Sequence, residues 1–149
     1  MTKQLIFRAC MAGILAGFLL GFSLKFIQEV SGLLVYTLLM NVDYIPVLKE
    51  FQFTEWIEFS FHLVISVVIG VLIMVIAIKQ NWSAQWIIYY TIIINVCIAI
   101  IIYPTTLFST RTPPLLSVPS IGMWISAHLL YGIVLGSLLM LILRKKRFF

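Results

Sequence analysis

The sequence predicts an all-α integral membrane protein, a bundle of four transmembrane helices with an extra helical segment on its outer side. Of its 149 residues, 62% are hydrophobic and 10% are charged, and the mean hydropathy is +1.13. A soluble domain carries roughly 25% charged residues to keep its surface wet. Four continuous apolar stretches are long enough to cross a hydrocarbon core of ~30 Å as helices. They do not alternate at period two, which excludes a barrel.

We expect one domain, residues 1–149, with spans at about residues 5–24, 56–78, 86–103 and 121–143. The segment 25–48 is harder to interpret, because its apolar stretch 30–40 is short and is followed by Asn41, Asp43 and Pro46. A fifth span there would move the C-terminal basic run to the outer side. We therefore expect the first helix to project beyond the membrane, or an amphipathic helix to lie on its outer surface, where Lys25 and Glu29 are spaced to pair.

The distribution of basic residues predicts the orientation in the membrane. Lys3, Lys79 and the terminal run fall at helix ends that a four-span layout places on one side, and the acidic loop 41–55 falls on the other. The positive-inside rule then puts both termini in the cytoplasm, and we expect the membrane to be a bacterial plasma membrane. The run is expected to contact anionic lipid head groups rather than nucleic acid. It consists of Arg144, Lys145, Lys146 and Arg147.

Small residues recur at every fourth position in three of the four spans, a pattern typical of a glycine zipper. Such rows let neighbouring backbones approach closely, so that dispersion contacts hold helices together inside lipid. We interpret the rows as packing within one chain; the alternative is a homo-oligomer, or contact with another membrane protein, through the first helix. The rows comprise Gly13, Gly17, Gly21, Ser66, Gly70, Gly132 and Gly136.

The two histidines are the strongest indication of chemistry. His62 and His128 lie six and seven residues into spans that both start on the outer side, so both rings are expected ~9–11 Å below the surface. Equal depth on parallel helices would let the two side chains meet. Glu58 precedes His62 by one turn and could orient its imidazole. Asn95, near mid-membrane, is expected to form an interhelical hydrogen bond rather than a transport site.

These polar residues support several interpretations. Plain structural use of the histidines is one. A second is an outer polar vestibule that binds a ligand or a proton, formed by Glu55, Glu58, His62, Arg111 and His128. A third is haem b or a divalent metal held by His62 and His128, in a redox protein. No catalytic motif is present in the sequence, and we expect no catalytic residue and no resident cofactor.

Two stretches resemble a known family. AGILAGFLLG at residues 12–21, the proline-rich outer loop, and HLLYGIVLG at residues 128–136 are similar to the YqhR-like small multi-pass membrane proteins of Gram-positive bacteria. The resemblance covers the first span and the last third of the chain, and it implies no reaction, cofactor or catalytic residue. The leading functional prediction is therefore a non-enzymatic accessory or interaction protein. The alternatives are a small transporter or ligand-binding membrane protein, and the haem or metal protein.

Overall fold

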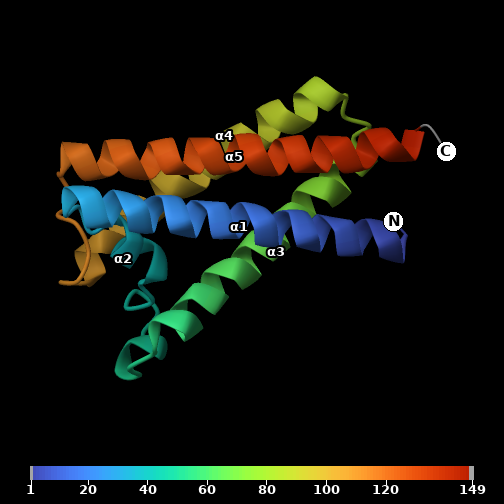
Figure 1. Cartoon of the computed structure of the whole chain (residues 1–149). Helices are drawn as coiled ribbons and strands as arrows, with labels where there is room; N and C mark the ends of the chain where they lie inside the picture. The colour runs from blue at the N-terminus through green and yellow to red at the C-terminus, as the bar shows by residue number, and fades with distance from the viewer. Residues whose placement is uncertain (1, 148–149) are drawn as a thin grey trace.

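The computed structural model describes residues 2–147, and in this part of the chain every regular element is a helix (Figure 1). The α-helices are α1 (Lys3–Ser31), α2 (Val35–Met40), α3 (Glu55–Lys79), α4 (Ala84–Ile102) and α5 (Val118–Arg147). Two 3-10 helices follow α2 and α4: η1 (Leu48–Glu50) and η2 (Tyr103–Phe108).

The four long helices α1, α3, α4 and α5 are each long and apolar enough to cross a membrane, which agrees with the predicted four-span bundle. The first helix is longer than predicted. Its 29 residues correspond to ~43 Å at 1.5 Å per residue, more than the ~30 Å of a hydrocarbon core. The extra turns continue the helix toward α2.

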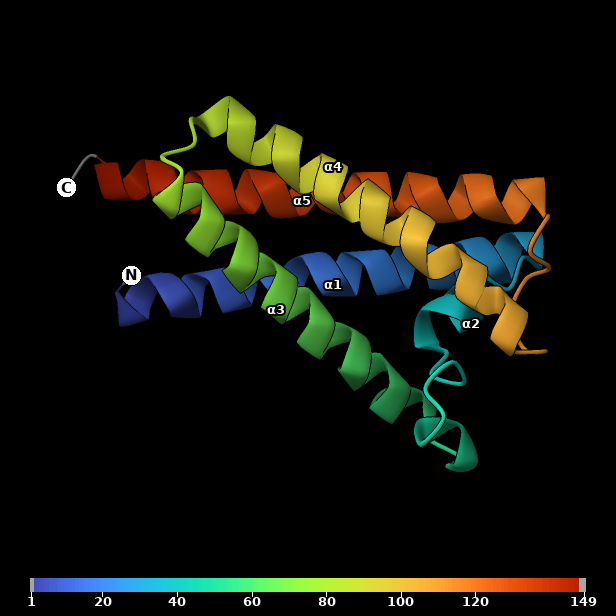
Figure 2. The ribbon, with the colours of Figure 1, turned by 180° about the vertical axis from the view of Figure 1, so that it is seen from behind.

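The long helices pack as two pairs. α3 lies against α1 and α4 lies against α5, and α1 and α5 join the pairs by packing on each other. In Figure 1, α1 and α5 run side by side in opposite directions, with both chain ends at the same end of the bundle. Figure 2 shows the opposite face, where α3 and α4 both lead from their short connection toward the end that carries α2.

The predicted small-residue rows lie at the contacts within these pairs. A β-carbon on Gly13 would lie 2.7 Å from the carbonyl oxygen of Ser66 on α3, and one on Gly132 would lie 2.9 Å from Cα of Ile92 on α4. Gly136 approaches Cα of Ile88 as closely. Because real β-carbons do not approach a backbone to such distances, only glycine permits these crossings. In the rest of the first row the close neighbours are side chains, since Gly17 faces that of Ser66 and Gly21 faces the ring of Phe59.

The segment between α1 and α3 corrects one expectation. Gly32 caps the end of α1 with a φ of 71° that reverses the chain, and α2 then packs back into the bundle against α1, α3 and α5. Val35, Leu38 and Met40 are buried. α2 therefore packs into the bundle and is not an amphipathic helix exposed on its surface. The apolar face of so short a helix is better covered by neighbouring helices than by interfacial water. The expected Lys25–Glu29 pair was also wrong, because Lys25 Nζ lies 2.6 Å from Glu55 Oε1 instead.

Candidate functional site

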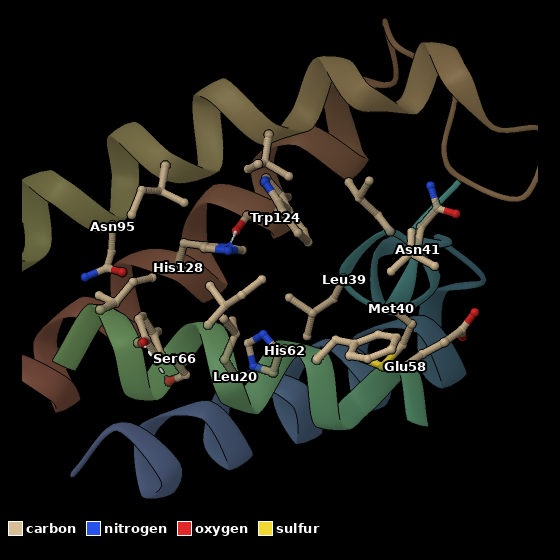
Figure 3. A pocket seen from close by; sticks show the side chains of 18 of the residues that line it. Leu20, Leu39, Met40, Asn41, Glu58, His62, Ser66, Asn95, Trp124 and His128 are labelled. Atoms are coloured by element: carbon tan, nitrogen blue, oxygen red, sulfur yellow. Dashed lines mark hydrogen bonds between the residues drawn. The ribbon is translucent and has the colours of Figure 1, made fainter. Parts of the chain in front are cut away.

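A cavity of about 120 Å³ lies between α3, α4 and α5, with α2 at its outer end and Leu20 of α1 behind it. We call it the inner cavity; Figure 3 shows the side chains around it. His62 of α3 and His128 of α5 both line its wall. The structure thus brings both histidines of the chain to one space.

His62 is held in place by the first helix. Its Nε2 lies 3.1 Å from the carbonyl oxygen of Gly17, and the missing side chain at Gly17 is what lets α3 approach that closely. A carbonyl oxygen only accepts, so a neutral His62 donates from Nε2–H. Nδ1 is left unprotonated, and it has no hydrogen-bond partner among the described residues. Glu58 does not orient the ring as the sequence suggested, because its carboxylate faces Arg111 at 3.4 Å.

His128 is fixed from its own helix. Its Nδ1 lies 2.9 Å from the carbonyl oxygen of Trp124, one turn earlier. The rings of Trp124 and His128 also contact each other, with centroids 4.2 Å apart and planes tilted by 48°. Trp124 is itself fixed, because its Nε1–H donates to the Ala99 carbonyl at 3.0 Å. The neutral His128 therefore carries its proton on Nδ1 and leaves Nε2 as an acceptor.

Deeper in the inner cavity, two further polar side chains are committed to backbone groups. Ser66 Oγ donates to the Gly13 carbonyl at 2.7 Å and lies 2.8 Å from the Tyr131 hydroxyl. Asn95 Nδ2 donates to the Thr91 carbonyl at 2.7 Å, a bond within α4 and not the interhelical bond that was expected. Ser66, Tyr131 and Asn95 all line the cavity.

The side of the inner cavity between α3 and α4 is apolar. Phe61, Ile65 and Ile69 border it from α3, and Ile98 and Ile102 border it from α4. Ile65 is 53% exposed, and on a membrane-spanning helix an exposed isoleucine faces lipid. α3 and α4 share few contacts with each other, so close packing of these two helices does not close this side of the inner cavity.

A second cavity, of about 380 Å³, lies at the end of the bundle that carries α2, and we call it the outer vestibule after the site predicted from the sequence. Glu55, Glu58 and Arg111, three of the five residues predicted for an outer vestibule, line it. His62 and His128 line the inner cavity instead, and Glu58 borders both spaces. The predicted vestibule is thus two adjoining compartments that share the Glu58 side chain.

Ion pairs connect the segments that surround the outer vestibule. Glu55 Oε1 accepts from Lys25 Nζ at 2.6 Å and from the Tyr36 hydroxyl at 2.8 Å. Burial, followed by the hydrogen bond to Glu55, raises the pKa of the Tyr36 phenol above its ordinary value. Arg111 reaches Glu58 at 3.4 Å and Asp43 at 3.8 Å. The loop after α4 is thereby tied to α3 and to the segment after α2.

Neither Asn41 nor Tyr131 was predicted from the sequence as a site residue. Asn41 is 2% exposed and lines the inner cavity, and its Nδ2 has no hydrogen-bond partner in the described part of the chain. Its only signal was a polar residue directly after an apolar stretch. Tyr131 follows His128 by three positions, so helical spacing placed it on the same face.

Two features of the site concern the predicted metal and haem binding: the possible metal ligands and the volume of the cavity. Within residues 2–147, no group of three or more His, Cys, Asp or Glu side chains gathers where it could hold a metal ion. The inner cavity of about 120 Å³ is smaller than a cavity of about 150 Å³ that accepts one benzene ring. A tetrapyrrole between His62 and His128 would require the helices to separate.

Comparison with known protein families, with curated proteins and with solved structures finds no match to this chain.

Proposed function

We propose that this protein is a ligand-binding membrane protein that takes a small amphiphilic molecule from the bilayer into the inner cavity. The observation that carries this proposal is that His62 and His128 both line that cavity. Each ring has one nitrogen bonded to a backbone carbonyl and the other uncommitted within the described structure. Unpaired acceptors in a poorly hydrated site are costly unless a ligand satisfies them.

The surroundings of the histidines support a ligand that comes from lipid. Apolar side chains form the wall between α3 and α4, whereas the polar groups lie at the back of the inner cavity. Pockets of this composition, apolar with a few convergent polar groups, are typical of small-molecule sites. The leading expectation from the sequence was a non-enzymatic accessory protein. Such a protein would not need two unpaired acceptors on the wall of one cavity.

The membrane and the orientation are part of the proposal. We place the bundle in a bacterial plasma membrane with both termini in the cytoplasm, so that the inner cavity lies in the outer half of the bilayer. The position of both chain ends at one end of the bundle supports an even number of spans (Figure 1). The residues Arg144, Lys145, Lys146 and Arg147 then meet anionic head groups.

Native mass spectrometry of the protein released from mild detergent tests this function. The wild-type protein is expected to retain a small apolar molecule. Ile98→Trp, which adds an indole to the cavity wall, is expected to lose it. Ile101→Trp is the matched control, because Ile101 lies on the same helix and is 71% exposed.

Circular dichroism and gel filtration establish that both variants fold. If Ile98→Trp fails to fold, His128→Phe serves in its place, since it removes the free acceptor at nearly constant volume. Retention of the same molecule by the cavity variant and by the control would refute the proposal, as would a wild-type protein that retains no molecule at all.

A further inference from the structure

We infer that the ligand carries a neutral, hydroxyl-bearing head group, of a size up to about one six-membered ring, that donates hydrogen bonds to His62 and His128. This inference rests on the proposed function and adds the chemical class of the ligand. It follows from an account of which polar groups of the inner cavity are donors and which are acceptors.

The histidine nitrogens that remain are both acceptors. His62 uses its proton on Nε2 for the Gly17 carbonyl, and His128 uses its proton on Nδ1 for the Trp124 carbonyl. Carbonyl oxygens cannot donate, so the neutral tautomers are fixed from outside the cavity. His62 Nδ1 and His128 Nε2 are consequently lone-pair sites.

Deeper in the cavity, the hydroxyl of Tyr131 also offers a ligand only an acceptor, because its proton is already used. Ser66 has one hydroxyl proton and donates it to the Gly13 carbonyl. The contact of 2.8 Å between Ser66 Oγ and Tyr131 Oη must then use the proton of Tyr131. What Tyr131 retains for a ligand is a lone pair. Three neighbouring side chains thus accept, and a head group must donate to satisfy them.

The charge of the side chains that line the cavity and the size of the cavity limit the class of ligand further. The carboxylate among the residues lining the inner cavity is that of Glu58, and it is paired with Arg111 at the outer vestibule. A cation bound beside the histidines would lack a counter-charge in a poorly hydrated environment, which is costly. A neutral hydroxyl avoids that cost. A cavity of about 120 Å³ is slightly smaller than one of about 150 Å³ that accepts a benzene ring, so a single ring is the upper limit for the head group and a longer apolar tail must lie outside the cavity.

Asn41 complements these acceptors, because it offers the cavity a hydrogen-bond donor. Its Nδ2, which has no partner within the described residues, is a donor at the outer end of the same cavity. A head group with two oxygens can donate to the histidines and accept from Asn41. Hydroquinones with an alkyl tail fit this pattern, and so do alkyl diols, because each carries two hydroxyl groups.

Titration calorimetry in detergent with paired probes tests the inference. Decylhydroquinone is compared with its dimethyl ether, which keeps the ring and tail but cannot donate. We expect the hydroquinone to bind the wild-type protein at least about tenfold more tightly, because the ether leaves buried acceptors unpaired. The preference should disappear in His128→Phe and persist in Ile101→Trp. Decane-1,2-diol against its dimethyl ether distinguishes an alkyl diol from an aromatic ring.

The outcomes separate this inference from the proposed function. If both members of each pair bind equally and Ile98→Trp abolishes binding, the cavity binds ligands but the requirement for a donor is wrong. If Ile98→Trp leaves binding unchanged, the site lies elsewhere and both proposals fail. If no probe binds while native mass spectrometry still finds a retained molecule, the hydroxyl class is wrong and the proposed function stands.

Discussion

The Nε2 atom of His62 lies 3.1 Å from the carbonyl oxygen of Gly17, so the glycine that lets two helices touch also sets the protonation of a cavity residue. Glycine rows are usually discussed as packing devices. Here the close approach also exposes a backbone carbonyl to a ring on the facing helix. Packing and site chemistry are thereby coupled at a single contact.

The first prediction concerns helix packing. Gly13→Leu is expected to destabilise the bundle by about 1–3 kcal/mol, because overpacking forces neighbours apart and the neighbour here is the α3 backbone at Ser66. Gly122→Leu is the matched control, since a β-carbon at Gly122 meets nothing within 4 Å. Thermal unfolding in detergent measures both. Equal melting temperatures would show that α1 and α3 do not pack through this row.

The second prediction concerns the Glu58–Arg111 pair. The Glu58 side chain is 8% exposed, so Arg111→Gln leaves a buried carboxylate without its partner, at a cost of about 1–3 kcal/mol. Lys25→Gln breaks a pair that is half exposed on both sides and should cost about 0–1 kcal/mol.

A double variant provides the control for this pair. Glu58→Gln in the Arg111→Gln background should recover part of the lost stability, because it removes the unpaired charge. Denaturation curves of the four proteins in the cycle measure the coupling. Additive effects of the two substitutions would mean that Glu58 and Arg111 do not interact.

The third prediction concerns orientation. In a background with Cys10 and Cys97 replaced by alanine, a cysteine at Asp43 should react with a membrane-impermeant maleimide added to intact cells. A cysteine at Lys79 should react only after the cells are opened. The reverse pattern would invert the topology, and labelling at both positions in intact cells would contradict the four-span model.

The sequence was sufficient to predict four long apolar helices, because lipid imposes a simple rule: long apolar helices that satisfy their own backbone. It also indicated that His62 and His128 could share one space, since they stood out as polar groups at similar depth. It could not give helix rotation, and so it assigned Glu58 to His62 rather than to Arg111. That error arose because Arg111 lies 53 residues away on a loop, where no helical spacing applies.

The segment that follows α1 shows a second limit. Its composition indicated a helix but not its depth, because residues 30–40 suit the interface, a short insertion or a projecting turn. The deciding features were the reversal at Gly32 and the hydrogen bond from the Thr37 backbone N–H to Gln28 Oε1 at 2.9 Å. Neither follows from hydrophobic periodicity. As a result Asn41, which α2 delivers to the inner cavity, was not anticipated.

The most direct test of the account is ¹⁵N nuclear magnetic resonance of the imidazoles, with and without decylhydroquinone. The chain contains two histidines, so a protein purified with a histidine-free tag gives two rings, assigned by His62→Phe and His128→Phe. We predict that His62 is protonated at Nε2 and His128 at Nδ1, and that the probe shifts only the unprotonated nitrogen of each ring, both together. The opposite tautomer in either ring, or a probe that moves neither acceptor nitrogen, would contradict the account.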